Sequence, residues 1–332
     1  MTAGLFSAGI IGIGSYVPEK VITNQDLEKI VDTSDEWIVT RTGIRERRIA
    51  AEEQATSDLG TIAARRALEN AGIRAEELDL IIVATVTPDM NFPSTACLIQ
   101  NNLKAARAAA FDVEAACSGF LYSLATANQF IATGFYRNIL VVGAECLSRF
   151  TDWKDRNTCV LFGDGAGAAI VGRVEHGYGM LSHLLGADGG GGDLLKLRAG
   201  GSRLPASPET VENHLHYVHM EGSEVFKFAV RAMVSAAEEA VRLAGMTKED
   251  LDYLIPHQAN IRIIKEAAKR LDMSMDRVWV NLDNYGNMSA ASIPVALEEA
   301  VRSGRIRKGD NICMVGFGGG LTWASCIMKW AK

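Results

Sequence analysis

Two stretches of the chain decide the fold: AGIRAEELDLII at residues 71–82 and AGMTKEDLDYLI at residues 244–255. They lie 173 residues apart, and the same offset carries NILVVG at 138–143 onto NICMVG at 311–316. A common helix-to-strand turn explains one such match, but it does not explain two that share an offset. The sequence therefore predicts two similar halves, 1–173 and 174–332, that pack about a pseudo-twofold axis.

The segments around these repeats alternate between apolar runs and amphipathic stretches. Strands are predicted at 9–15, 80–85, 109–113 and 139–143, and a helix at 57–71. Continuous runs of Ile, Val and Leu are typical of buried, mostly parallel strands. Their alternation with helices indicates a layered α/β fold.

The composition is that of an ordinary globular protein, with 332 residues, 48% hydrophobic and 22% charged. The formal net charge of −6 gives no indication of nucleic acid or an anionic membrane as the main partner. No Lys or Arg occurs in the first nineteen residues, and the apolar runs are too short to span a bilayer. The six cysteines form no C-x-x-C pair, which fits free thiols in a reducing cytoplasm.

Cys117 is the first candidate for chemistry, within FDVEAACSGFLYSLATANQFI at 111–131. A strand is predicted to end near Val113, and a buried helix to begin near Cys117. The positive end of the helix dipole favours a thiolate there, which would be a nucleophile. A lone cysteine after a strand is more often a small core residue, so its surroundings must decide.

His257 and Asn287 also follow predicted strands. His257 lies in LIPHQANIRII after the strand 253–255, and Asn287 in VNLDNYGNMSAASIPVAL, where a strand, a short turn and a helix are again expected. A histidine there can polarise a carbonyl or hold a thiolate as an ion pair. The alternatives are a capping histidine and a turn asparagine. A pseudo-twofold axis would bring these strand ends and Cys117 toward one cleft.

Glycines follow the last predicted strand, in FGGGLTW at 317–323. They let the backbone approach a substrate closely, and their N–H groups could stabilise an oxyanion together with that of Cys117. A flexible loop or a β-bulge is the alternative. His214, His216 and His219 lack a pattern that completes a metal site, and Gly12-x-Gly14 lacks the third glycine of a dinucleotide fingerprint.

The motifs together resemble those of β-ketoacyl-[acyl carrier protein] synthase III. They are SDEWIVTRTGIRERRI (34–49), AACSGF (115–120), FGDGAGAA (162–169), PHQAN (256–260), GNMSAASIP (286–294) and FGGG (317–320). This family initiates bacterial type II fatty acid synthesis, and the resemblance implies the thiolase fold, a duplicated five-layer α/β structure. It implies no metal and no cofactor, because the substrates are acyl-CoA and malonyl-ACP.

The resemblance also implies roles for the candidate residues. Cys117 would take an acetyl or other short acyl group from acyl-CoA, with the N–H groups of Cys117 and Gly319 as the oxyanion hole. His257 and Asn287 would hold the malonyl thioester during decarboxylation, and the resulting carbanion would attack the Cys117 thioester to give 3-oxoacyl-ACP, CoA and CO2. Asparagine, where chain-elongating relatives are expected to have histidine, points to the priming class.

Binding residues follow from the same resemblance. Matches to CoA contacts are Thr33, Trp37, Arg41, Arg156 and Asn260. Matches to the acyl pocket are Phe162, Met220 and Phe92, the last reaching across a homodimer interface, and matches to the carrier-protein docking site are Lys227 and Arg262. Residues 202–219 do not match the family pattern, so the acyl preference is left open. A polyketide-starter, quinolone-type or alkene-pathway relative, or a catalytically silent acyl-binding subunit, are the competing interpretations.

Overall fold

The structure is a computed structural model that describes residues 5–332, and its strands form two main sheets. The first has the order β1 (Ala8–Tyr16), β7 (Asp164–Arg173), β6 (Asn138–Cys146), β4 (Leu80–Ala84), β5 (Ala109–Val113). The second has the order β11 (Tyr253–Pro256), β12 (Asn311–Gly318), β13 (Thr322–Lys329), β8 (Gly179–Ala187). Each sheet is therefore built from one continuous part of the chain.

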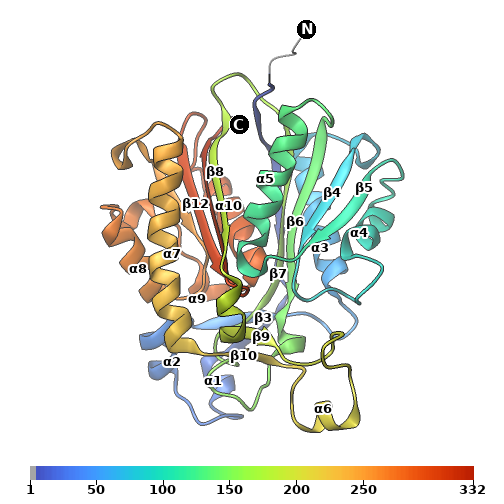
Figure 1. Cartoon of the computed structure of the whole chain (residues 1–332), viewed down its shortest axis with the longest axis vertical. Coiled ribbons are helices and arrows are strands. Elements are labelled where there is room, and N and C mark those ends of the chain that lie inside the picture. The colour runs from blue at the N-terminus through green and yellow to red at the C-terminus, as the bar shows by residue number, and fades with distance from the viewer. Residues whose placement is uncertain (1–4) are drawn as a thin grey trace.

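Helices cover both faces of both sheets (Figure 1). The helices α5 (Gly119–Ala132) and α10 (Ser292–Arg302) lie between the sheets, and their apolar side chains share one core cluster with strands of both. The outer face of the first sheet is covered by α3 (Thr56–Ala71) and α4 (Thr95–Leu103), and that of the second by α7 (Gly222–Leu243) and α8 (Ile261–Arg270). The result is the layered α/β arrangement that the sequence predicts.

The offset of 173 residues recurs in the elements nearest the centre. It carries the start of α5 onto the start of α10, and the 3-10 turn Ala116–Ser118 onto the 3-10 turn Ser289–Ala291. The first residues of both turns have a left-handed backbone, with φ of 45° at Ala116 and 44° at Ser289. Non-glycine residues rarely adopt this conformation, so the two turns share a strained geometry.

The second half departs from the predicted pattern before Asn287. The strand expected there is absent, and a short helix, α9 (Leu282–Tyr285), takes its place. Only an isolated bridge between Val278 and Leu254 continues the second sheet on that side. The prediction of a strand was wrong because the polar groups of this segment bond to other side chains instead of forming a ladder.

Smaller elements gather at one end of the layers, at the bottom of Figure 1. They are β2 (Lys20–Thr23), α1 (Asn24–Leu27), α2 (Asp35–Thr42), β3 (Glu46–Ile49), β9 (Leu195–Leu197), α6 (Pro208–Glu212) and β10 (Val218–Met220). β2 pairs with β3, and β9 pairs with β10. Among residues 5–332, no helix combines the length and apolar character needed to cross a membrane.

Candidate active site

A cavity of about 400 Å³ lies where the turn before α5 meets the ends of the two halves. Cys117, Ser289 and Gly319 line it, so three segments distant in sequence converge there. Its apolar walls include Val86, Leu147, Phe162, Leu195, Leu197 and Val218. His257 and Asn287 are buried beside this cavity and contact the residues around it.

Cys117 is held by a close approach between backbones. A Cβ atom at Gly318 would lie 2.5 Å from the Cys117 nitrogen, so only glycine fits at this strand end. Gly319, the next residue, lines the cavity together with Cys117. The glycine motif therefore brings the backbone of β12 against the candidate nucleophile, rather than forming a free loop.

The protonation state of Cys117 differs from the prediction. Burial raises the pKa of the thiol to about 12, and the charge of Glu145 raises it further, although the Ser289 hydroxyl has the opposite effect. The residue lies in the 3-10 turn directly before α5, but desolvation of the thiolate outweighs the helix dipole. The expectation of a resting thiolate was therefore wrong.

His257 lies directly after β11, where its backbone N–H donates to the Val315 carbonyl at 2.8 Å. Its ring packs edge-on against Phe317, with 5.5 Å between centroids. Burial lowers the pKa of the imidazole to about 3. Within residues 5–332 neither ring nitrogen has a hydrogen-bond partner, so a neutral imidazole is free to bond to a substrate. Of the two roles left open by the sequence, this favours polarising a carbonyl over an ion pair.

Asn287 is fixed in orientation by its own turn. Its backbone N–H donates to the Leu161 carbonyl at 2.8 Å, and its Oδ1 accepts from the Ser289 N–H at 2.8 Å. Because Oδ1 is occupied by a donor, Nδ2 is the atom of the amide left to donate. The alternative of a simple turn residue describes its backbone but gives no role to Nδ2, for which no hydrogen bond is formed within residues 5–332.

Gln258 joins the two segments that carry His257 and Asn287. Its Nε2 donates to the carbonyls of Pro256 at 2.8 Å and Trp279 at 3.1 Å, and its Oε1 accepts from the Asn281 N–H at 3.0 Å. The side chain is fully buried. It therefore locks the end of β11 to the segment that leads into Asn287.

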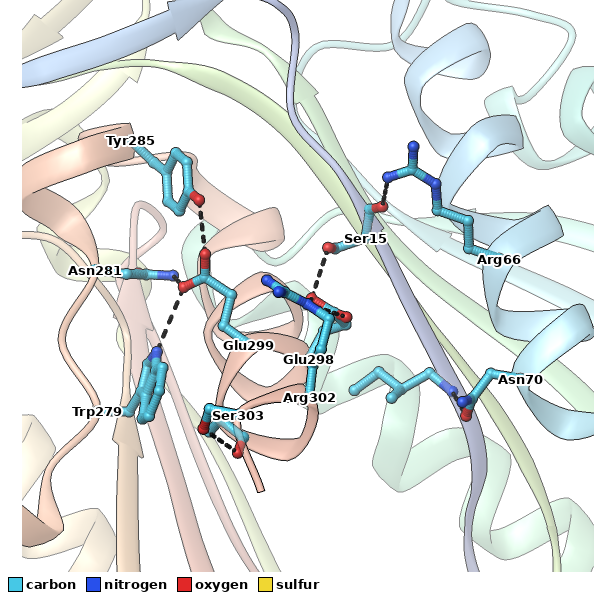
Figure 2. Close-up of polar contacts among 12 residues, drawn as sticks. Ser15, Arg66, Asn70, Trp279, Asn281, Tyr285, Glu298, Glu299, Arg302 and Ser303 are labelled. Atoms are coloured by element: carbon cyan, nitrogen blue, oxygen red, sulfur yellow. Dashed lines mark hydrogen bonds and ion pairs between the residues drawn. The ribbon is translucent and has the colours of Figure 1, made fainter. Parts of the chain in front are cut away.

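Glu299 on α10 anchors the same segment from the other side, as Figure 2 shows. Its carboxylate accepts from Asn281 Nδ2 at 2.6 Å and from the Tyr285 hydroxyl at 2.6 Å, while Trp279 Nε1 lies 3.5 Å away. Gln258 lies within the PHQAN motif, but neither its role nor that of Glu299 is predicted from the sequence, because their partners become neighbours only in the folded chain.

The predicted CoA contacts gather around Trp37 on α2. The guanidinium carbons of Arg41 and Arg156 lie 4.8 Å and 4.5 Å from the centre of its ring. The Thr33 hydroxyl is buried and, in the part of the chain from residue 5 onward, has no hydrogen-bond partner. Four of the five predicted CoA residues thus supply an aromatic face, two cations and a buried hydroxyl without a hydrogen-bond partner in the described residues.

Asn260, the fifth, is occupied within the protein. Its Oδ1 accepts from the Arg262 N–H at 2.8 Å as the N-cap of α8, and its Nδ2 donates to the Arg41 carbonyl at 2.9 Å. The side chain therefore positions Arg41 and the start of α8.

Lys227 and Arg262 line one groove between α7 and α8. Lys227 pairs with Glu224 at 2.7 Å, and Arg262 lies over the Phe226 ring at 5.3 Å. Arg231 and Arg270 line the same groove. The groove is thus bordered by more cations than the two that the sequence suggested.

The three residues predicted for the acyl pocket do not all line the cavity that contains Cys117. Phe162 lines the cavity, but Met220 does not: it pairs with Leu195 at the end of the β9–β10 hairpin and packs against the core beneath α7. Val218 of the same strand lines the cavity, and the assignment of Met220 to the acyl pocket stays a prediction. Phe92 is 86% exposed and lies outside the cavity of its own chain.

The three histidines near residue 216 bond to different partners. His214 pairs with Asp152 at 2.9 Å, His216 with the Thr210 hydroxyl at 2.9 Å, and His219 with Glu221 at 3.2 Å. In the described residues, no group of three or more potential ligands could hold a metal ion.

Known proteins resemble this chain over nearly its whole length. The family model for 3-oxoacyl-[acyl-carrier-protein] synthase III matches residues 111–189, and that for its C terminal matches residues 241–330. Proteins named beta-ketoacyl-[acyl-carrier-protein] synthase III are 66% identical in Caldanaerobacter subterraneus subsp. tengcongensis (98% of both chains) and 58% identical in Clostridioides difficile (97% of this chain, 98% of the relative).

Solved structures are also similar to this chain over nearly its whole length. The 3-oxoacyl-[acyl-carrier-protein] synthase III of Aquifex aeolicus is 50% identical, covers 97% of this chain and 100% of its own, and superposes with a TM-score of 0.90. The enzyme of Thermus thermophilus is 51% identical, covers 97% and 99%, and gives a TM-score of 0.91.

The fold and these likenesses define a thiolase-fold condensing enzyme, a class of acyltransferases. Within this class, the chain belongs to the β-ketoacyl-[acyl-carrier-protein] synthase III family. It initiates type II fatty acid synthesis by condensing an acyl group from acyl-CoA with malonyl-ACP.

Proposed function

We propose that Cys117 carries the acyl group and that His257 and Asn287 bind the malonyl thioester. The observation that carries this proposal is the pair of unused hydrogen-bonding groups beside Cys117: within residues 5–332 the imidazole nitrogens of His257 have no partner, and the Asn287 amide is oriented by Ser289. Buried polar groups without partners are rare in folded proteins. A substrate carbonyl would satisfy both donors.

In the first half-reaction the Cys117 sulfur attacks the thioester carbonyl of acyl-CoA. A bond forms between this sulfur and the carbonyl carbon, and CoA leaves with the electrons of its own carbon–sulfur bond. The N–H groups of Cys117 and Gly319 are the proposed donors to the oxyanion. This assignment is supported by the close packing of the Gly318–Gly319 backbone against Cys117 at the cavity.

In the second half-reaction the malonyl thioester loses CO2. The electrons of the broken carbon–carbon bond move into an enolate, whose oxygen would accept hydrogen bonds from His257 and Asn287. The enolate carbon then attacks the acyl carbonyl on Cys117, and the Cys117 thiolate leaves. A neutral imidazole suits this role, because it can donate one hydrogen bond without a counter-ion, and burial keeps the pKa of His257 low.

The binding surfaces belong to the same proposal. The Trp37 face with Arg41 and Arg156 would hold the CoA nucleotide by stacking and charge. The groove with Lys227 and Arg262 would dock an acidic carrier protein, despite the net charge of −6. No metal or cofactor is proposed, since a thiol and hydrogen-bond donors supply the chemistry.

We further propose that the chain forms a homodimer in the cytoplasm. β5 is an edge strand of the first sheet, and Phe111 on it, Met90 and Phe92 are exposed apolar side chains. An unpaired strand edge beside large apolar side chains is a surface suited to a second copy. Phe92 would then reach the acyl pocket of the partner subunit.

Separate assays of the two half-reactions test the residue roles. Cys117→Ser should abolish acylation and condensation, because an alcohol is a far poorer nucleophile without a strong base. Asn287→Ala should keep acylation of Cys117 near the wild-type rate and block malonyl decarboxylation. Equal loss of both half-reactions in Asn287→Ala would contradict the assignment.

A further inference from the structure

Glu145 is a fully buried carboxyl that the condensation steps above do not employ. It lies near the end of β6, and its Oε2 accepts from the Thr87 hydroxyl at 2.6 Å, the Thr85 hydroxyl at 3.2 Å and the Val86 N–H at 3.2 Å. Burial raises the pKa of the carboxyl to about 7, although the hydrogen bonds oppose this. A carboxyl with a pKa near 7 can exchange a proton near neutral pH.

Ser289 lines the cavity with a hydroxyl that, in the described chain, is buried without a hydrogen bond of normal geometry. It is held at φ of 44° and occupies the position equivalent to Ala116, the residue before Cys117. A strained residue that presents an unsatisfied hydroxyl to a cavity calls for a functional explanation.

The three groups form one cluster. The Ser289 hydroxyl lies close enough to Cys117 and to Glu145 that it lowers the pKa of both, while the charge of Glu145 raises the pKa of the Cys117 thiol. The Ala290 N–H points to Glu145 Oε1 at 3.5 Å, which keeps the turn of Ser289 against the carboxylate. Ser289 is therefore a neighbour of both groups, because it lines the cavity with Cys117 and the next residue of its turn contacts Glu145.

We propose that Ser289 passes the thiol proton of Cys117 to Glu145 during acylation. The inference rests on Cys117 being the acylated nucleophile. As the sulfur bonds to the thioester carbonyl, its proton moves to Ser289 Oγ, and the Ser289 proton moves to the Glu145 carboxylate. When the bond between the acyl carbon and the CoA sulfur breaks, Glu145 returns a proton by the same path to the CoA thiolate. The net change is acyl transfer, and both relay residues regain their starting state.

His257 is the other base near Cys117, and it is the weaker acceptor. Burial lowers its pKa to about 3, against about 7 for Glu145, and no hydrogen bond joins it to the thiol within residues 5–332. The titratable groups that face Glu145 are Cys117 across Ser289 and Cys146, the next residue of β6, whose pKa burial raises to about 12. Neither thiol titrates near neutral pH, so the carboxyl alone should govern acylation there.

The test is the single-turnover rate of Cys117 acetylation by acetyl-CoA, measured from pH 5.5 to 8.5 by mass spectrometry. We expect the wild-type rate to rise through about pH 7. Glu145→Gln and Ser289→Ala should each slow it roughly a hundredfold and remove this rise, since positioned proton transfer contributes at about that level. Glu145→Asp should retain part of the rate. Glu298→Gln, which neutralises a carboxyl bonded to Ser15 and Arg302, is the matched control and should behave as wild type.

Iodoacetamide alkylation separates the relay from mere packing. Glu145→Gln removes a like charge near the thiol, so the pH midpoint of Cys117 alkylation should move down while acetylation slows. Wild-type acetylation rates and pH profiles in Glu145→Gln and Ser289→Ala would overturn the relay. If Glu145→Gln does not fold, judged by circular dichroism, the Ser289→Ala profile decides alone. Absence of any acetyl group on wild-type Cys117 would instead overturn the proposed function.

Discussion

At the scale of single residues, the charge state of His257 links stability to acidic pH. Its pKa is about 3 in the folded chain and near 6.5 when unfolded, so below pH 6.5 the unfolded chain binds the extra proton. The free energy of unfolding should therefore fall as the pH falls, by about 3 kcal/mol from this group at pH 4.5. His257→Asn should lack that component in urea unfolding at pH 7 and 4.5. An equal loss in both proteins would contradict a buried, neutral histidine.

The candidate residues themselves could be predicted from the sequence, but their protonation could not. Cys117, Asn287 and His257 stand at the ends of predicted segments, and the motifs around them are specific. The thiolate expected at the start of α5 fails because desolvation depends on every layer that covers Cys117. Ser289 and Glu145 were missed for a related reason, since only the folded chain brings their turns together.

At the scale of elements, the contact between β12 and the turn before α5 sets the geometry of acylation. Gly318→Ala would place a Cβ atom 2.5 Å from the Cys117 nitrogen and push apart the two backbones that carry the oxyanion donors. We expect acetylation of Cys117 to slow roughly a hundredfold, the usual effect of losing one such donor. Single-turnover acetylation measures this, and a rate within twofold of wild type would contradict the assigned oxyanion hole.

The hydrogen bonds from Asn281 and Tyr285 to Glu299 on α10 should affect only the second half-reaction. Glu299→Gln leaves Asn281 or Tyr285 without its acceptor, which costs about 2 kcal/mol and loosens the segment before Asn287. Malonyl decarboxylation should slow about tenfold, while acetylation of Cys117 stays near wild type. Glu298→Gln, on the same helix but bonded elsewhere, is the control. Loss of both half-reactions together would show a general rather than a local defect.

At the scale of the whole molecule, the repeat offset predicted the layered architecture from a few matched segments. It succeeded where both halves keep the same element, as with α5 and α10. It failed at α9, where side-chain hydrogen bonds to Glu299 replaced a strand ladder. The offset of 173 also relates the β2–β3 pair to the β9–β10 pair, because it carries the pair Ile22–Arg47 onto the pair Leu195–Met220. The repeat was not recognised there in the sequence, because the side chains of the two pairs differ.

The exposed edge of β5 predicts the assembly state. The wild-type chain should sediment at about twice its mass of 35.8 kDa. Phe111→Lys places a charge on this edge strand, which should shift the equilibrium toward the monomer without unfolding the chain. Sedimentation velocity measures both, and a wild-type monomer would contradict the proposed interface.

Both half-reactions depend on an acyl group being carried by Cys117. Incubation of the intact chain with acetyl-CoA, followed by peptide mapping by mass spectrometry, tests this directly. We predict one acetyl group, located on the peptide that contains Cys117 and absent from Cys117→Ser. An unmodified wild-type chain, or acetylation at another of the six cysteines, would contradict the account.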